Sequence, residues 1–230
     1  MVSIANEIKV LSGGAMRRFM VDAVPQFERQ TGRKVAVRFA QTRVLAQEIE
    51  AGAAFDVALL PRPELDALAR AGRIAAGSQT DVTRSAVGLV VRAGAAKPDI
   101  KTVEAFKRAV LAAKSVSYSH GPSGMYIADL MQRLGLAKEL EPKTVFAVGR
   151  PVAEVVAKGE AEIGMQQIIE ILPVAGAELV APLPSELQNV IVYAAGLSAA
   201  ANAEGARAFV TFLKSPEAAR IILAKGMEPG

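Results

Sequence analysis

The segment FERQTGRKVAVRFAQTRVLAQEIEAGAAFDVALLP, Phe27–Pro61, contains two strand patterns with a helix pattern between them. Val35, Val37 and Phe39 alternate with other residues, which predicts a strand over Lys34–Phe39. Apolar residues at helical spacing follow over Val44–Ala51, and a glycine ends them. Phe55–Leu60 is a short apolar run typical of a buried strand. Strand, helix and strand in this order predict a parallel α/β unit.

The same alternation extends in both directions from this segment. Upstream, a strand over Ile8–Leu11 precedes a helix from about Ala15 to Gln30. Downstream we expect further strands at Ala86–Arg92, Ser115–Ser119, Thr144–Ala147, Glu162–Met165 and Leu187–Ala194. We expect further helices at Glu64–Ala71, Val103–Ala113, Met125–Leu134, Val152–Lys158, Gly205–Lys214 and Pro216–Lys225. The prediction is an α/β fold with mixed sheets and helices on both faces.

Composition excludes several classes of chemistry. The 230 residues are 51% hydrophobic and 22% charged, which is typical of an ordered globular protein of one or two domains. With no cysteine and one histidine, His120, thiolate and multi-histidine metal sites are excluded, and we expect no metal and no cofactor. Dinucleotide, P-loop and serine-hydrolase motifs are also missing from the sequence.

The charge distribution and hydropathy restrict the partners. Net charge is +4, and the basic residues are scattered without a run of five, so we expect no nucleic-acid partner. No stretch approaches the roughly 18 apolar residues of a membrane span, so we expect no membrane insertion. We expect a monomer, periplasmic if a signal peptide precedes this sequence and cytoplasmic otherwise.

Two connections repeat the order strand, glycine-bearing turn, helix. They lie at Ser12–Gly14 and His120–Gly124. The first turn of a helix has unpaired N–H donors and the positive end of the helix dipole, so it can hold an anion. Glycine lets a ligand approach the backbone closely. Alternatively these are ordinary connections that are rich in Gly and Ser for turn geometry alone.

Four segments together resemble the periplasmic molybdate-binding proteins of ABC importers. The first comprises the opening strand with Ser12–Met16, followed by Phe27–Pro61. The others are GPSGMYIADLMQRLG (121–135), KGEAEIGMQQ (158–167) and LKSPEAARIILAKGME (213–228). The resemblance implies a two-lobed type II periplasmic binding fold with a ligand cleft between the lobes. It implies lobe 1 at 1–83 and 196–230 and lobe 2 at 84–195.

The resemblance also implies a set of ligand residues. The family's first-loop serine corresponds to Ala15, with Ser12, Gly13 and Gly14 just before it, and its second-loop serine corresponds to Thr42. In lobe 2 the loop positions correspond to Ser123 with Gly124 and to the neighbourhood of Arg150, and the binding tyrosine corresponds to Gln167. One hydroxyl and one phenol are therefore replaced in this chain.

Arginines stand at or beside these loops, at Arg17, Arg43 and Arg150. The two parallel donors of a guanidinium match the two oxygens of a carboxylate. We therefore expect a small organic di- or tricarboxylate in preference to molybdate. The alternative is that Arg17 and Arg43 point to solvent, as most surface arginines do.

Three function classes follow from the resemblance. The first is a solute-binding protein that carries a small anion to an ABC importer permease. The second is an enzyme on the same fold, similar to aconitate isomerase, for which His120, Tyr118 or Tyr126 would supply acid–base catalysis. The third is a ligand-sensing domain of a LysR-type regulator, which the missing DNA-binding helices make the weakest.

Overall fold

The computed structural model describes residues 7–200 and 203–230, which divide into two compact units. Unit 1 comprises the chain up to Arg84 and from Ile191 onward, and unit 2 comprises Ser85–Val190. The chain passes between the units within strands β4 (Thr80–Arg92) and β9 (Val190–Leu197). The divisions thus fall at 84/85 and 190/191, where the sequence led us to expect 83/84 and 195/196.

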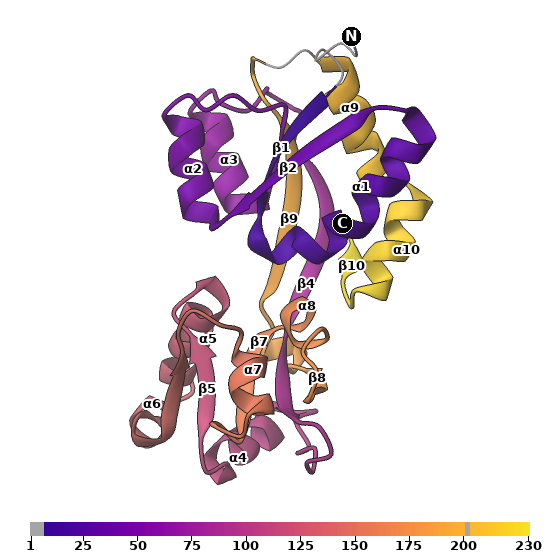
Figure 1. Ribbon diagram of the computed structural model, residues 1–230. Coiled ribbons are helices and arrows are strands. Elements are labelled where there is room, and N and C mark those ends of the chain that lie inside the picture. The colour runs from indigo at the N-terminus through magenta and orange to yellow at the C-terminus, as the bar shows by residue number, and fades with distance from the viewer. Residues whose placement is uncertain (1–6, 201–202) are drawn as a thin grey trace. The chain divides into compact units, whose positions relative to one another are not determined.

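Unit 1 is a sheet covered by helices on both sides. Strand β1 pairs in parallel with β2 and β3, and β3 pairs antiparallel with β9. Figure 1 shows α2 and α3 on one side of this sheet and α1, α9 and α10 on the other. The elements that complete unit 1 are β1 (Glu7–Gly13), the 3-10 turn η2 (Gly14–Met16), α1 (Arg17–Thr31), β2 (Lys34–Ala40), α2 (Thr42–Glu50), β3 (Val57–Pro61), α3 (Arg62–Arg70), α9 (Ala203–Leu213), α10 (Pro216–Ala224) and β10 (Glu228–Pro229).

Helix α1 follows from its apolar spacing. Phe19, Met20, Ala23 and Phe27 recur at three- and four-residue intervals and are all buried. The Phe27 ring meets the Phe209 ring of α9 edge-on, with centroids 5.0 Å apart. The helix ends at Thr31 because the next residue, a glycine with φ of 69°, adopts the left-handed conformation that stops a helix.

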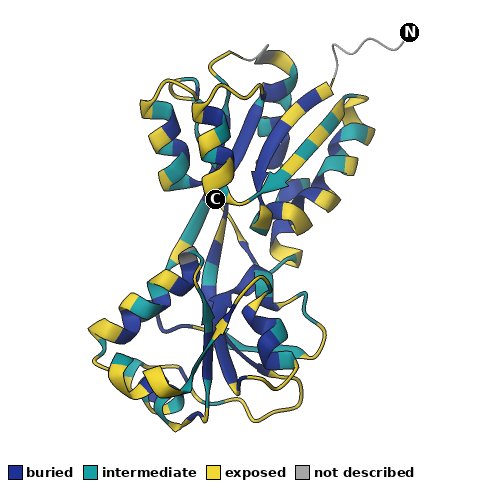
Figure 2. Ribbon diagram, turned by 60° about the vertical axis from the view of Figure 1, so that its left-hand side comes forward, coloured by how far each residue is buried: buried dark blue, intermediate teal, exposed yellow. Residues whose placement is uncertain are grey.

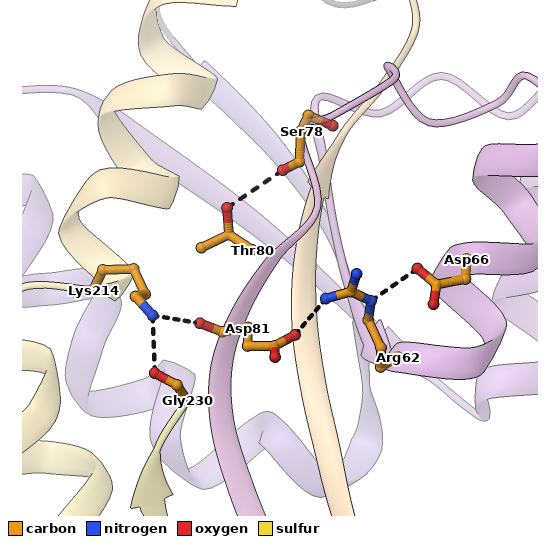
Figure 3. A network of polar contacts seen from close by, with 7 residues as sticks. All are labelled: Arg62, Asp66, Ser78, Thr80, Asp81, Lys214 and Gly230. Carbon is orange, nitrogen blue, oxygen red and sulfur yellow. Dashed lines mark hydrogen bonds and ion pairs between the residues drawn. The ribbon is translucent and has the colours of Figure 1, made fainter.

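A polar network attaches the start of β4 to three other parts of unit 1 (Figure 3). Arg62 donates to the carboxylates of Asp66 (2.8 Å) and Asp81 (2.6 Å). Lys214 donates to the backbone carbonyls of Asp81 (3.0 Å) and Gly230 (2.9 Å). The first residue of α3 and the residue that follows α9 are therefore bonded to the same residue of β4, and Lys214 also bonds the C-terminal residue.

The sheet of unit 2 has the strand order β4-β7-β5-β6, which continues the order β2-β1-β3-β9 of unit 1, and β8 also pairs with β4. Strands β7, β5 and β6 are parallel to one another, whereas β4 runs antiparallel to β7. Its remaining elements are α4 (Val103–Ala112), β5 (Val116–Ser119), α5 (Pro122–Arg133), α6 (Ala137–Leu140), η3 (Glu141–Lys143), β6 (Thr144–Ala147), α7 (Val152–Ala157), β7 (Ile163–Gln167), α8 (Ile168–Ile171), β8 (Ala177–Pro182) and η4 (Ser185–Leu187).

The unit 2 sheet is buried on both faces. Leu89 and Val91 of β4 join the apolar cluster that includes α4 and α5, whereas Val90 between them joins the cluster of α7. Figure 2 shows the strands largely buried and the outer faces of the helices exposed. The predicted α/β class with mixed sheets and helices on both faces is therefore confirmed.

Some predicted boundaries were wrong. The strand expected over Leu187–Ala194 begins at Val190, because the preceding residues form η4 and the Gln188 side chain bonds the backbone of Val87. Helix α5 begins at Pro122, three residues before the expected start, since proline suits the first helical position. Strand β8 has no clear alternation and was not predicted.

Lys143 gives a first prediction, on stability. Its ammonium donates to the carbonyls of Leu111 (2.6 Å), Ala113 (2.7 Å) and Val110 (3.3 Å) at the end of α4, where a cation is stabilising. We expect Lys143→Met to cost about 2 kcal/mol, the scale of a charged hydrogen bond. Thermal denaturation would measure this against Lys138→Met, a control on the exposed surface of α6. An equal loss in both variants would contradict it.

Two negative findings apply to residues 7–200 and 203–230. None of the helices there has the length and hydropathy needed to cross a membrane. Over the same residues, no three histidine or acidic side chains lie close enough to hold a metal ion.

Candidate functional site

In unit 1, the predicted ligand residues gather where β1 and β2 end. These strands are parallel, so their carboxyl ends lie at one edge of the sheet, which is where ligands bind in such sheets. Gly13 ends β1, and a Cβ placed on it would be 3.5 Å from Oγ1 of Thr42, the first residue of α2. The structure therefore brings Gly13 and Gly14 together with Thr42.

Arg17 and Arg43 stand beside this group. Both are exposed, and neither forms an ion pair within the described part of the chain. The Arg17 guanidinium lies over the ring of Phe39, 4.3 Å from its centroid, so its orientation is restrained by a cation–π contact. Arg17 thus keeps its hydrogen-bond donors available for an anion.

The side chains of Ser12 and Ala15 offer no free hydrogen-bond donor to an anion, although both lie in the predicted ligand loop. Ser12 is fully buried, and its hydroxyl donates to the carbonyl of Gly13 at 3.3 Å. Ala15 lies half-buried in η2 and has no polar side chain. The neutral donors of this loop are therefore its backbone N–H groups and the Thr42 hydroxyl.

In unit 2, three connections leave one edge of the sheet. They follow β5, β6 and β7, which are parallel, so their carboxyl ends lie together. His120 lies in the β5–α5 connection, Ser123, Gly124 and Tyr126 lie in the first half of α5, Arg150 lies in the β6–α7 connection, and Gln167 ends β7. The structure thus gathers the predicted unit 2 residues at one sheet edge.

The β5–α5 turn is tightly closed. A Cβ on Gly124 would lie 1.8 Å from the carbonyl oxygen of Ser119, so only glycine fits there. The Ser119 hydroxyl accepts the N–H of Gly121 at 3.2 Å, which closes the turn from the other side. Ser123 is buried in the first turn of α5, with 5% of its surface exposed.

His120 is exposed but held in place. Its ring stacks on Phe146 of β6, with centroids 4.4 Å apart and an angle of 18° between the planes. The Tyr118 ring meets the Phe146 ring edge-on, with centroids 5.2 Å apart. An imidazole with a restrained orientation and access to solvent is suited to proton transfer.

Tyr126 has a structural partner. Its hydroxyl donates to the carbonyl of Leu187 at 3.0 Å, and its ring packs against the core of unit 2. The Arg133 guanidinium lies 5.6 Å from the ring centroid. A phenol whose proton is committed to a backbone carbonyl is a weaker acid–base candidate than His120.

Arg150 also has a partner. Its two terminal nitrogens donate to the two carboxylate oxygens of Glu160, Nη1 to Oε1 at 2.8 Å and Nη2 to Oε2. This pairing raises the pKa of the Arg150 guanidinium and lowers the pKa of Glu160. An anion that used Arg150 would therefore have to compete with Glu160 or share the guanidinium with it.

Gln167 lies beside an acidic side chain that the sequence did not point out. Glu170 is the third residue of α8, three positions after Gln167. Burial is the largest influence on the Glu170 carboxyl and raises its pKa, while the polar groups of Gln166 and Gln167 nearby oppose that shift. Gln167 itself is buried, with 5% of its surface exposed.

The helices next to these loops begin without a capping side chain at the N-cap position. These are α1, α2, α5, α7 and α8, whereas Thr102 and Ser215 cap α4 and α10. In α7 the Gln166 side chain accepts the N–H of Ala153. Uncapped first turns leave backbone N–H donors for an anion. The loops of both units can therefore offer neutral donors, and unit 1 adds two arginines without acidic partners among the described residues.

Glu170 gives a prediction about pH. Its raised pKa means that the folded protein favours the protonated carboxyl, so stability falls as pH rises from the unfolded value, about 4.3, through the folded value. We expect Glu170→Gln to raise the melting temperature at pH 7, since a neutral amide of nearly the same shape avoids the cost of burying a charged carboxylate. The gain should shrink as pH falls toward 4, and a gain that is independent of pH would contradict the prediction.

Several of these partners lay outside sequence reasoning. Phe39, Phe146 and Glu160 contact predicted site residues only in the folded chain. No local pattern in the sequence indicates these contacts. Glu170 did have a signal, because an acceptor three residues after a helix-capping position is the spacing of a capping box.

The comparisons with known proteins agree with the fold. The family model described as bacterial extracellular solute-binding protein matches residues 8–228. An aconitate isomerase from Pseudomonas sp. is 32% identical, covering 96% of this chain and 87% of the relative. The molybdate-binding protein ModA of Escherichia coli K12 is 28% identical, covering 96% and 88%.

Solved structures show the same architecture. The substrate-binding domain of a molybdenum ABC transporter from Clostridium difficile superposes with a TM-score of 0.83 at 18% identity, covering 97% of this chain and 99% of that one. The periplasmic molybdate-binding protein of Azotobacter vinelandii superposes with a TM-score of 0.74 at 22% identity, with the same coverage. At these identities the likeness concerns the fold alone.

Proposed function

Because this chain belongs to the bacterial extracellular solute-binding protein family, we propose that its ligand is a small organic tricarboxylate of the aconitate type. Fold alone does not identify a ligand, so the proposal depends on the loop residues. The ligand would be held by backbone N–H groups, hydroxyls and arginines of the loops described above.

One observation carries the proposal. Arg17 stands at the β1–α1 loop with its guanidinium restrained over Phe39 and no acidic partner in the described residues. A guanidinium forms two parallel hydrogen bonds with a carboxylate, and leaving such a donor unpaired costs little only while it is hydrated. The nearby replacement of a family hydroxyl by Ala15 removes a donor suited to a tetrahedral oxyanion.

The relatives support the proposal but differ from one another. One is named for aconitate and the other for molybdate, at 32% and 28% identity. The residues of this chain that we assign to the ligand are Ser12, Gly13, Gly14, Ala15, Arg17, Thr42 and Arg43 in unit 1 and Ser123, Gly124, Arg150 and Gln167 in unit 2.

A panel of anions tests the ligand class. Molybdate, tungstate, sulfate, phosphate, citrate, malate and both aconitates would be compared by thermal shift and then by calorimetry. A ligand at a hundredfold excess over its Kd adds about 2.7 kcal/mol, which raises the melting temperature of a chain of this size by about 5–10 °C. Stabilisation by an aconitate or citrate is the expected result. Stabilisation by molybdate or tungstate alone would overturn the proposal.

Isomerisation of aconitate is a second candidate function. It is favoured by the exposed and restrained His120 together with the relative named aconitate isomerase. Cis- and trans-aconitate have the same composition, so a base that takes a proton from the methylene carbon and returns it to the former alkene carbon completes the reaction without a co-reactant. His120 can take and return that proton.

Ultraviolet monitoring of cis–trans conversion tests this second function. We expect His120→Ala to lose turnover and keep aconitate binding, and Tyr126→Phe to keep both, because the Tyr126 hydroxyl is committed to Leu187. An absence of turnover in the parent protein would leave the solute-binding function. That function would then include delivery to an ABC importer permease in the periplasm.

A further inference from the structure

We propose that Phe146 is a positioning residue, whose ring holds the His120 imidazole in a fixed orientation in which it meets the ligand. We call the three rings of Tyr118, Phe146 and His120 the aromatic cluster. The inference rests on the proposed function, because His120 has a role there only if an aconitate binds at these loops. Phe146 was not predicted as part of the site.

Phe146 is exposed on an edge strand. It lies in β6, the last strand in the order of the unit 2 sheet, and 44% of its surface is exposed. Large apolar side chains exposed on an edge strand favour unwanted association, and natural sheets commonly place charged residues there. An exposed phenyl ring at this place therefore needs an explanation, and the rings that it contacts provide one.

The aromatic cluster connects His120 to the core of unit 2. Tyr118 and Phe146 stand opposite each other in the parallel register of β5 and β6, and their rings meet edge-on, with centroids 5.2 Å apart. Tyr118 packs against the apolar core that includes α4 and α5. The Phe146 ring stacks on the His120 imidazole, with centroids 4.4 Å apart and 18° between the planes. The exposed imidazole is thus attached, ring by ring, to the buried part of the sheet.

Stacking orients the imidazole without using its nitrogens. Stacked rings contact each other through their faces, whereas the two nitrogens of an imidazole and their N–H bonds lie in the plane of the ring. Within residues 7–200 and 203–230, no hydrogen bond or ion pair engages the His120 ring. Both nitrogens are therefore available to hydrogen-bond a carboxylate of the ligand or to exchange a proton with it.

The backbone on both sides of His120 is fixed, so the aromatic cluster has only the side-chain torsions to restrain. Ser119 ends β5, α5 begins two residues after His120, and Gly124 closes the turn against the carbonyl of Ser119. An exposed side chain without a stacking partner samples several rotamers, and ordering it on binding lowers the affinity. Phe146 restrains these torsions before the ligand binds, which favours a reaction step that depends on alignment.

NMR of the imidazole tests the stacking directly. His120 is the only histidine of the chain, so the imidazole C–H signals belong to this ring alone. The ring current of a stacked phenyl group moves these signals upfield. In Phe146→Leu, which keeps an apolar side chain on β6, we expect them to move downfield, toward those of an unstacked histidine. Phe146→Tyr keeps an aromatic ring and should nearly keep the parent signals. Spectra at acid and at alkaline pH would compare like protonation states.

Turnover of aconitate and calorimetric affinity for trans-aconitate test whether the orientation matters. We expect Phe146→Leu to lower kcat about 10–100-fold, the effect of a misplaced reacting group, and to change KM by less. If the parent binds aconitate without converting it, the expected loss is about tenfold in affinity, the scale of one hydrogen bond to a charged group. Phe146→Tyr should retain most of either quantity, because a tyrosine ring stacks in the same way.

Lys143→Met is the control for loss of stability. It removes polar contacts between η3, which directly precedes β6, and the end of α4, and it leaves the aromatic cluster intact. It should lower the melting temperature and leave the imidazole signals, the turnover and the affinity unchanged. If Phe146→Leu does not fold, Phe146→Met replaces it with the same expectations.

The outcomes separate this proposal from the proposed function. Unmoved imidazole signals in Phe146→Leu, or full turnover and affinity in spite of moved signals, would overturn the role of Phe146 and leave the ligand class standing. Losses in Lys143→Met as large as those in Phe146→Leu would also overturn that role, since they would follow from lost stability. A parent protein that binds neither aconitate would overturn the proposed function, and the role of Phe146 with it.

Discussion

Replacing Gly124 by alanine is expected to unfold unit 2 or to cost at least about 4 kcal/mol of stability, at the upper end of single-substitution effects. The added Cβ would lie 1.8 Å from the carbonyl oxygen of Ser119 and 2.5 Å from its carbonyl carbon. Both obstructing atoms belong to the backbone of β5, so no side chain can rotate away to make room. Circular dichroism and thermal denaturation would measure the loss.

Gly121→Ala is the matched control for this prediction. It adds the same methyl group to the same turn, where a Cβ would be 3.4 Å from the Ser119 hydroxyl, and the backbone there is in the extended region that alanine adopts. We expect this variant to retain most of its stability. Equal stability of the two variants would show that the turn is not closed as the structure has it.

Replacing Arg17 by alanine is expected to weaken the binding of trans-aconitate by about 10–100-fold. A hydrogen bond to a charged group contributes about 1.5–3 kcal/mol, and each 1.4 kcal/mol corresponds to a tenfold change in Kd. Because Arg17 is exposed and in no ion pair among the described residues, the fold should be almost unaffected. Calorimetry would measure the Kd, and the melting temperature of the free protein would check the fold.

Arg18→Ala serves as the control for Arg17→Ala. Arg18 is the next residue of α1 and is also exposed, so this variant removes the same charge from nearly the same place. Long-range attraction would be weakened alike in both variants, whereas a direct bond would be lost only in Arg17→Ala. Similar losses of affinity would therefore remove the reason for placing Arg17 in the site.

Most of the architecture could be predicted because its causes are local. Helical spacing in Arg17–Thr31 buries one face of α1, and a glycine in the left-handed conformation ends that helix. Alternation in Lys34–Ala40 leaves one face of β2 half-buried and the other mostly exposed. Strand β8 was missed because its residues have no such period and are only half-buried. The strand expected from Leu187 begins only at Val190, because Ser185–Leu187 form η4 and the Gln188 side chain bonds the backbone of Val87.

The sequence by itself determined the α/β class, the two glycine-bearing turns and the positions along the chain from which ligand residues come, since these depend on spacing between neighbours. Only the tertiary structure decided which partner each candidate side chain contacts. It pairs Arg150 with Glu160, commits the Tyr126 hydroxyl to Leu187, stacks His120 on Phe146 and leaves Arg17 over Phe39. The partner of a long polar side chain depends on which residue, distant in sequence, the folded chain brings within about 3 Å. The periodicity of a short segment does not predict that distance.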